Sequence, residues 1–348
     1  MAYTTINKSS LHMNTKLYTG TGADNNAITG VGFQPDFTWL KSRSVAEGHY
    51  LQDAVRGATK HLHSQNTDAE ATQTNALKSF DSDGFTVGNE ADINTNNSTN
   101  VSWNWKAGTT SGITTDGNTT ITPSSYSINQ TAGFSILKFI GNGVEGAKLA
   151  HGLGTTPAMV IIKRTSTTGD WVVYHKNLTA TKSVFLNYAD AEAARSPNGY
   201  IYSPDATNIT LSNHGDINNN GVTTVAYCFA EKTGYSKFGS YVGNGNADGT
   251  FVYTGMKPSF ILIKNASAGG QSWRLVDNKR IGYNPNNIQL YPNLVNAEST
   301  SEYVVDIVSN GFKVRATDSG VNGSGNTMIY LAIGQSLVGS NNVPCTAR

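Results

Sequence analysis

The chain has 348 residues, a formal net charge of +1 at pH 7 and only 14% charged residues, against about 25% in an average protein. This balance gives no global attraction to nucleic acid or to an anionic membrane. No apolar run approaches the length of a membrane span, and the first residues lack the basic and apolar regions of a Sec signal. We therefore expect a chain that folds in the cytoplasm, binds no nucleic acid and inserts into no membrane.

A motif of Gly-x-x-Pro, an apolar run and a Lys occurs three times at constant spacing. The copies read Gly32-Phe-Gln-Pro35-Asp-Phe-Thr-Trp-Leu-Lys41, Gly154-Thr-Thr-Pro157-Ala-Met-Val-Ile-Ile-Lys163 and Gly255-Met-Lys-Pro258-Ser-Phe-Ile-Leu-Ile-Lys264. Pro sets φ without donating to a strand ladder, and the following run is apolar on both faces. Each copy therefore predicts a turn followed by a central strand that is buried on both sides.

Three further markers recur in the same order around this motif. A Gly-x-Gly turn precedes it, an acidic or amide residue followed by Ala-Glu comes after it, and an Asn stands seven residues before a strand of alternating large residues. The turns are Gly20/Gly22, Gly141/Gly143 and Gly243/Gly245; the acidic elements are 68–70, 190–192 and 296–298; the Asn residues are Asn94, Asn218 and Asn322. Such repetition indicates an internal triplication.

Short strands separated by Gly-rich turns favour an all-β protein over helical repeats. We expect three tandem β-sandwich domains of the jelly-roll, concanavalin-like kind, with half-buried antiparallel closing strands such as 101–105. Helix is expected only as short turns, for example around 68–77.

The spacing of the markers sets the domain boundaries. The predicted domains are repeat 1 (1–107), repeat 2 (130–233) and repeat 3 (234–338), with a Thr/Gly/Ser-rich linker at 108–129 and a tail at 339–348. Ile121 and Tyr126 suggest that part of the linker joins a strand. The short boundary between repeats 2 and 3 predicts that these two pack closely.

Two cysteines cannot form a disulfide framework. Cys228 lies in an apolar strand-like run and is interpreted as a small buried hydrophobe. Cys345 lies in the tail, where an exposed thiol is expected.

The Asp-Ala-Glu elements resemble the paired carboxylates of glycoside hydrolases. Their flanks are small and polar, which is typical of a loop or a first helical turn, and the third copy has Asn296 in place of Asp. A structural role is therefore favoured, and no catalytic residue is assigned.

Metal sites are equally weakly indicated. The run Asp216-Ile-Asn-Asn-Asn-Gly221 opens like a calcium loop, but Tyr227 occupies the position of the bidentate acid. His61 and His63 alternate as metal ligands can, yet neither other copy has His there, so surface histidines are favoured. We expect neither a metal nor a cofactor.

The remaining candidates are aromatic and charged residues on repeat loops. Trp171 and Trp273 each follow the repeat Lys after a Gly/Ser/Thr-rich turn, where an indole can stack on a sugar, although core packing is the favoured alternative. The pairs Asp53/Arg56 and Asp277/Arg280 are interpreted as structural ion pairs, and repeat 2 has His175 at the Asp position.

Several segments resemble a repeat-domain family of marine tailed phages, those of cyanobacteria and of pelagic bacteria, whose members often stand beside lectin-like or laminin-G-like domains. These segments are GFQPDFTWLKSR, SFDSDGFTVG, VSWNWKAG, AGFSILKFIGNG, VAYCFAEKTGYSKFGSYVGNG and NGFKVR. The resemblance covers nearly the whole chain. It implies a virion structural protein built from concanavalin-like sandwiches, and it brings no site residues to transfer.

The favoured functional hypothesis is a non-enzymatic tail-fibre or tail-tip protein that attaches the virion to a host cell-surface glycan. Repeated weak modules gain avidity, and homo-oligomerisation multiplies that gain. Its expected partners are other virion proteins and the glycan, and its expected location is the virion, after assembly in the host cytoplasm. The alternatives are a capsid decoration protein or a tail or baseplate accessory subunit, and then a glycan depolymerase. The stretches between Lys and the acidic elements diverge, so the three repeats are not expected to bind identical ligands.

Overall fold

The structure is a computed structural model that describes residues 4–194, 199–300 and 304–338. It is all-β, with every strand pair within its sheets antiparallel. Cys345 lies outside the described residues, whereas Cys228 is fully buried and unpaired, as predicted.

Each repeat contains a larger sheet with one strand order. The first strand of the repeat pairs with the last, the last with the Gly-x-x-Pro strand, and that strand with the next; repeat 2 adds one strand at each edge. In sheet order, the strands of repeat 1 are β1 (Met13–Thr19), β9 (Thr99–Trp105), β3 (Phe37–Ser42) and β4 (Tyr50–Asp53). Those of repeat 2 are β10 (Ser125–Asn129), β11 (Phe134–Ile140), β18 (Thr223–Phe229), β13 (Met159–Arg164), β14 (Val172–His175) and β15 (Val184–Phe185). Those of repeat 3 are β19 (Ser236–Val242), β25 (Thr327–Gln335), β21 (Lys257–Asn265) and β22 (Arg274–Asp277).

Each repeat also has a three-stranded sheet with one order and one short helix. These sheets are β2 (Asn26–Thr29), β8 (Gly84–Val87) and β7 (Leu77–Asp81); β12 (Ala147–Ala150), β17 (Asn208–Leu211) and β16 (Ile201–Pro204); β20 (Phe251–Tyr253), β24 (Gly311–Val314) and β23 (Val305–Val308). The helices are α1 (Ala91–Asn94), α2 (Gly215–Asn218) and α3 (Ser319–Asn322), and the rest is a 3-10 turn (Ser9–Leu11) and the pair β5 (Lys60–His61) and β6 (Ala71–Thr72). The triplication is thus confirmed strand by strand.

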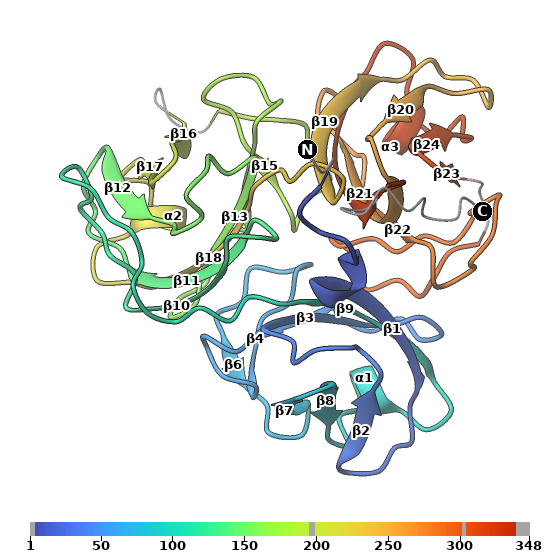
Figure 1. Cartoon of the computed structure of the whole chain (residues 1–348), viewed down its shortest axis with the longest axis horizontal. Coiled ribbons are helices and arrows are strands. Elements are labelled where there is room, and N and C mark those ends of the chain that lie inside the picture. The colour runs from blue at the N-terminus through green and yellow to red at the C-terminus, as the bar shows by residue number, and fades with distance from the viewer. Residues whose placement is uncertain (1–3, 195–198, 301–303, 339–348) are drawn as a thin grey trace.

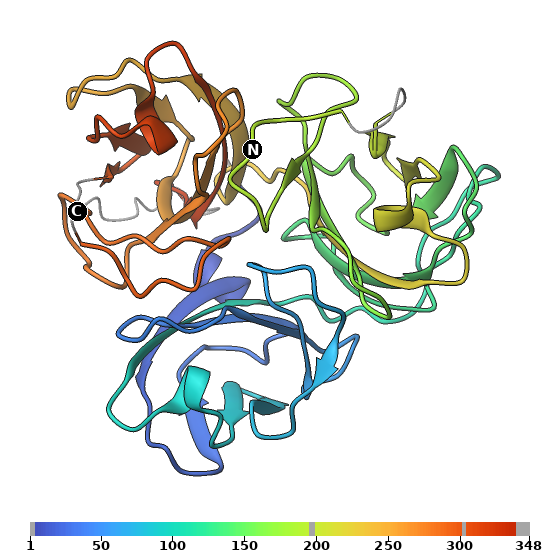
Figure 2. The ribbon, with the colours of Figure 1, turned by 180° about the vertical axis from the view of Figure 1, so that it is seen from behind.

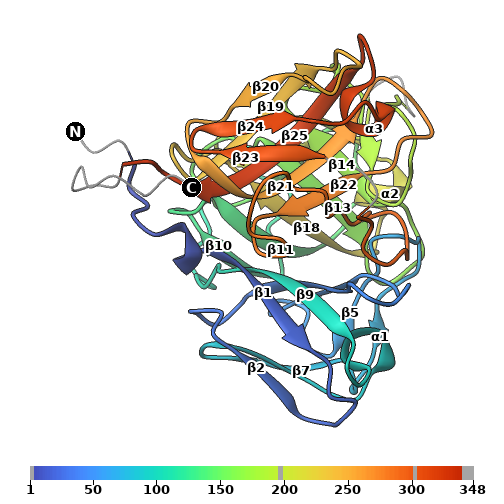
Figure 3. The same ribbon diagram turned by 90° about the vertical axis from the view of Figure 1, so that its right-hand side faces the viewer.

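The three repeats form a closed ring rather than a row. Figure 1 and Figure 2 show three lobes around a common centre, with the first and third lobes in contact. The three helices lie toward the same side of the molecule (Figure 3). The N-terminal segment takes part in the closure, because the backbone N–H of Ser9 donates to Oε1 of Gln335 at 2.8 Å.

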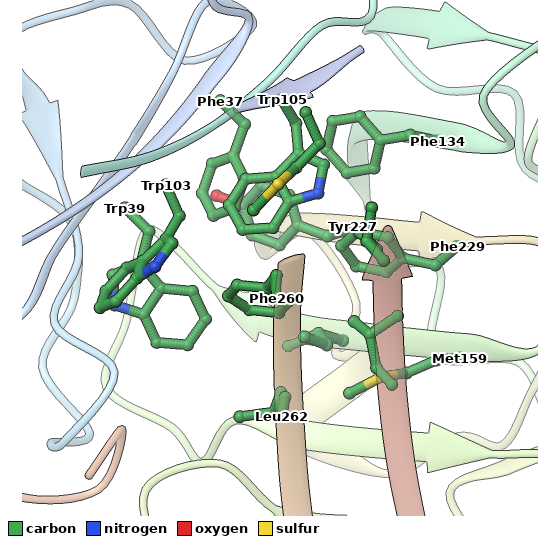
Figure 4. Packing of buried hydrophobic residues seen from close by; sticks show 14 of the residues in the cluster. Phe37, Trp39, Trp103, Trp105, Phe134, Met159, Tyr227, Phe229, Phe260 and Leu262 are labelled. Carbon is green, nitrogen blue, oxygen red and sulfur yellow. The ribbon is translucent and has the colours of Figure 1, made fainter. Parts of the chain in front are cut away.

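The centre of the ring is a hydrophobic core shared by all three repeats (Figure 4). The ring of Phe37 lies 4.6 Å from that of Tyr227, and the ring of Trp105 lies 5.5 Å from that of Phe260. The space among these side chains is about 10 Å³, which is no more than one water sphere. The ring therefore has a packed centre and not a channel.

A second hydrophobic cluster lies inside each repeat, between its larger and smaller sheets. This corrects the prediction of half-buried closing strands, because β9, β18 and β25 are buried on both faces. In β9, Trp103 and Trp105 point to the shared centre, and Ser102 and Asn104 on the opposite face are buried too.

In each repeat, the marker Asn holds the Gly-x-Gly turn in place by hydrogen bonds. In repeat 1, Oδ1 of Asn94 accepts from the N–H of Thr21 at 2.9 Å. The backbone carbonyl of Asn94 accepts from the N–H of Gly22 at 2.7 Å. A Cβ on Gly20 would lie 2.1 Å from the carbonyl oxygen of Thr95, and Gly22 has φ +67°, so both positions need glycine. Asn218 and Asn322 make the same bonds in their repeats.

Two expectations about loops differ from the structure. No helical turn forms over 68–77, because Ala71–Thr72 pairs with Lys60–His61 as β6 and β5. The segment 108–129 is not a free tether: Ser125–Asn129 forms β10, and Ile121 is buried in the core of repeat 2. The suggestion that part of the linker joins a strand is therefore confirmed by Tyr126 in β10, whereas Ile121 makes only an isolated bridge to Leu149.

Candidate functional site

The acidic elements cross from each repeat to the next and close the ring. In each, the Glu backbone N–H donates to a carbonyl two residues after the repeat Lys of the neighbouring repeat. The three bonds are Glu70 to Thr165 at 2.8 Å, Glu192 to Ala266 at 2.7 Å and Glu298 to Arg43 at 2.8 Å. These contacts support the structural interpretation of the elements, because each element forms part of a seam between repeats.

The repeat lysines lie in the same seams and are fully buried. Nζ of Lys163 donates to the carbonyl of Thr67 at 3.1 Å, and Nζ of Lys264 donates to that of Ala189 at 3.1 Å. Burial lowers the pKa of each repeat lysine, Lys41 included, to about 8. Lys163 and Lys264 therefore bond carbonyls where one repeat meets another, whereas Nζ of Lys41 donates to the carbonyls of Ser42 and Val45 in its own repeat.

The Asp/Arg pairs are buried ion pairs that also reach across a seam. Nε of Arg280 donates to Asp277 at 2.7 Å, with neither side chain exposed, and its NH1 reaches Glu298 at 3.2 Å. The indole of Trp103, from repeat 1, donates to the same Asp277 oxygen at 3.0 Å. In repeat 1, Asp53 and Arg56 make the matching pair, with Tyr227 of repeat 2 as the donor.

Repeat 2 departs from this pattern for a reason visible across its seam. The residue equivalent to Trp103 and Tyr227 in repeat 3 is Leu331, which has no donor for a carboxylate. His175 takes the Asp position instead, and its Nε2 lies 3.1 Å from the carbonyl oxygen of Tyr330. Its Nδ1 accepts from the N–H of Asn177, so Nε2 carries the proton and donates.

Trp171 and Trp273 are fully buried, so neither can offer an indole face to a sugar. Each donates its indole N–H to a carbonyl across a seam. At the equivalent position of repeat 1, Nε2 of His49 bonds a carbonyl across a seam in the same way. The acceptors are the carbonyls of His63 at 2.9 Å for Trp171, Phe185 at 2.8 Å for Trp273 and Tyr291 at 3.0 Å for His49. The stacking hypothesis for these tryptophans is thus corrected to core packing, the alternative favoured from the sequence.

The two alternating histidines are part of a packed cluster and not a surface pair. His61 is buried, its ring stacks on Tyr50 at 4.9 Å, and His63 meets it edge-on at 4.8 Å. Burial lowers the pKa of His61 to about 4. The surface assignment is therefore wrong for His61, because the pairing of β5 with β6 and Tyr50 cover it.

The calcium-like loop also has a structural role. Asp216 accepts from Arg164 at 2.8 Å, and Asn218 holds the Gly-x-Gly turn of its repeat. In the described ranges no three His, Cys, Asp or Glu side chains are placed to hold a metal ion. The same ranges contain no helix long and apolar enough to cross a membrane.

What distinguishes the repeats is their outer surface, and repeat 3 carries an aromatic pair there. Phe251 and Tyr253 alternate on the edge strand β20, and they are 48% and 62% exposed. Residues two apart on a strand point to the same face. The equivalent positions in the other repeats hold Ala27 and Thr29, and Lys148 and Ala150.

Cross-strand neighbours complete this face, which we call the aromatic face. Lys313 and Gly311 of β24 lie opposite Phe251 and Tyr253. Beyond them, Asp306 of β23 pairs with Lys313 in the ladder. The face therefore presents two aromatic rings beside the charged residues Lys313 and Asp306. Gly311 has no side chain to cover the ring of Tyr253.

Reasoning from the sequence missed the aromatic face, although the signal is present in it. Aligning the strand that follows each Gly-x-Gly turn shows large aromatics at alternate positions in repeat 3 alone. The tryptophans were the more prominent candidates in the sequence, but a large indole is more often buried in a core than exposed to a ligand.

These features define an all-β protein of three equivalent units around one core, with a surface specialised in the third. The chain belongs to the family described as Domain of unknown function (DUF7483), whose model matches residues 8–336. The family model thus covers all three repeats at once. Neither curated proteins nor solved structures gave a match.

Proposed function

We propose that the chain is a bacteriophage virion protein of the tail fibre or tail tip, and that it binds a host cell-surface glycan through the aromatic face of repeat 3. The phage assignment rests on the resemblance of the segments quoted above. The observation that carries the binding function is the exposure of Phe251 and Tyr253, at 48% and 62%, in one repeat of three.

Each repeat is proposed to be a β-sandwich domain of the jelly-roll, concanavalin-like kind. A larger and a smaller antiparallel sheet enclosing a hydrophobic cluster support this assignment. The shared centre and the seams fix the three domains relative to one another, so repeats 1 and 2 act as a rigid support for repeat 3.

The chemistry of the aromatic face suits a sugar chain. An aromatic ring offers a flat apolar surface to the C–H face of a sugar ring, and the ion pairs of Lys313 with Asp248 and of Asp306 with Arg315 offer polar partners to its hydroxyls. One such face binds weakly. Homo-oligomerisation and anchoring to other virion proteins would raise the avidity, since binding at further copies becomes intramolecular.

Glycan binding by the full chain should be weakened at least tenfold by Phe251→Ala with Tyr253→Ala. Loss of a central aromatic anchor costs more than about 1.4 kcal/mol, which is a factor of ten. A glycan array selects the ligand, and titration calorimetry measures the affinity. The matched control is Ile140→Ala with Val144→Ala, which removes two apolar side chains of repeat 2 that are 55% and 56% exposed.

The control variant should bind like the wild type. Equal affinity of all three proteins would remove the aromatic face as the glycan site, and no binding to any glycan on the array would reject the binding function.

The second candidate is a capsid decoration protein or a tail or baseplate accessory subunit. One observation favours it: the aromatic pair lies on the edge strand of its sheet, and an open edge can also pair with another protein. We do not extend the proposal to a depolymerase, because Glu70, Glu192 and Glu298 each bond partners within the seams.

A further inference from the structure

Repeat 3 contains an insertion that the other repeats lack. Leu62, Val184 and Leu290 are equivalent positions, since each pairs with the same strand of its repeat. From Asp277 to Leu290 the chain advances thirteen positions, whereas from Asp53 to Leu62 and from His175 to Val184 it advances nine. The four additional residues lie within 281–289.

The insertion builds one wall of a pocket of about 380 Å³. That volume is at the small end of the range, about 300–1,000 Å³, of pockets that hold small molecules. Among the described residues, aromatic, amide and aliphatic groups line the pocket together with one lysine and no carboxylate. The lining residues are Lys257, Asn278, Gly282, Tyr283, Asn284, Asn286 and Ile307.

Side-chain hydrogen bonds to the backbone hold the insertion in place. Nδ2 of Asn284 donates to the carbonyl of Ile307 at 2.7 Å, and its Oδ1 accepts from the N–H of Ile307 at 2.9 Å. The buried Asn286 donates to the carbonyl of Asp277 at 2.8 Å. The loop is therefore anchored to β23 on one side and to β22 on the other, which keeps the pocket preformed.

An exposed ring and a buried acceptor without a donor both indicate that the pocket can hold a ligand. Tyr283 is 69% exposed and is the one aromatic side chain among the described lining residues. Oδ1 of Asn278 is buried and has no hydrogen-bond partner in the described part of the chain. A buried acceptor without a donor is costly, and a ligand hydroxyl would satisfy it once the amide turns toward the pocket.

We propose that this pocket binds a single neutral sugar residue, with the sugar ring against Tyr283 and one hydroxyl donating to Asn278. A sugar hydroxyl both donates and accepts, which matches an amide-rich wall, and an aromatic ring matches its C–H face. The pocket would bind the terminal sugar residue of a chain, whereas the aromatic face would bind sugar residues along the chain. The inference rests on the proposed function for the class of ligand, and its site is separate.

Saturation-transfer NMR on the full chain, with the methyl glycosides of glucose, galactose, mannose and N-acetylglucosamine, tests the pocket. Transfer to the ring protons of at least one glycoside is expected, with at least a fivefold loss in Tyr283→Ala and in Asn278→Leu. Ile140→Ala, which removes an exposed apolar side chain of repeat 2 outside both proposed sites, should leave the transfer unchanged. Far-UV circular dichroism confirms that each variant is folded, and Tyr283 is exposed enough for its replacement to leave the core intact.

The outcomes separate this inference from the proposed function. Absence of transfer to all four glycosides, or transfer that survives both pocket variants, overturns the pocket even where the array shows binding through Tyr253. Transfer that depends on Tyr283, combined with an array that shows no binding through the aromatic face, would support the pocket and reject the aromatic face.

Discussion

Arg280→Ala is expected to lower the free energy of unfolding by about 3–5 kcal/mol. The substitution leaves the carboxylate of Asp277 fully buried without its cation, and it removes one of the two arginines that hold Glu298. It also disturbs the seam between repeats 3 and 1, because Trp103 of repeat 1 bonds to that same carboxylate. Removing one partner of a buried pair costs far more than removing an exposed one.

Urea denaturation followed by tryptophan fluorescence measures this loss. The control is Arg315→Ala, which removes an arginine that pairs with Asp306 at 3.3 Å and is 41% exposed. An exposed pair contributes less than about 1 kcal/mol. Equal losses in the two variants would contradict the role assigned to the buried seam pair.

Acidification from pH 7 to pH 4 is expected to destabilise the protein strongly. Burial lowers the pKa of His61 and of His175 to about 4 and lowers the pKa of His49 well below its usual range. Between pH 6.5 and pH 4 the unfolded chain therefore binds more protons than the folded chain, so stability falls as the pH falls. For His175 alone the loss reaches about 3 kcal/mol at pH 4.

Two carboxyl groups act in the opposite direction. Burial raises the pKa of Asp36 and Glu47, so the folded chain binds their protons first and gains stability as the pH falls. Burial lowers the pKa of His151 as well, so four buried histidines oppose these two carboxyl groups and the net slope is expected to be a loss. Urea midpoints measured at pH 7, 6, 5 and 4 test the sign, and a midpoint that is constant or rises toward pH 4 would contradict it. His175→Gln should flatten the slope.

The repeat and its strand starts could be predicted from the sequence because they depend on local backbone chemistry. Gly20 and Gly22 are required by a close contact and a positive φ, and Asn94 by the hydrogen bonds that hold that turn. Such requirements recur unchanged in each copy, so they appear as fixed spacing. The burial of β13 and β21 on both faces follows from their unbroken apolar runs in the same way.

The closed ring could not be predicted, because its contacts join positions that local patterns do not relate. The bond from Glu298 to Arg43 links residues 255 positions apart, and no periodicity shows which repeat faces which. The alternation of Trp103 and Trp105 indicated a buried face, but not that the face belongs to a core shared by three repeats. Likewise, no local pattern shows that Lys163 and Lys264 donate to carbonyls of a neighbouring repeat.

The candidate site was missed for a related reason. Trp171 and Trp273 lie beyond polar turns in the sequence, yet the seams bury them. Phe251 and Tyr253 stand out only when the three repeats are aligned by strand, since an aromatic pair on a strand is ordinary in itself. In a triplicated protein, what differs between equivalent positions is a better guide to binding than what repeats.

The location of the chain in an intact virion tests the proposed attachment function most directly. Negative-stain imaging with a gold-labelled antibody to the folded chain, on phage particles that contain it, separates the candidates. Attachment through a tail fibre or tail tip predicts gold at the distal end of the tail. Gold distributed over the head would contradict it and would assign the chain to capsid decoration.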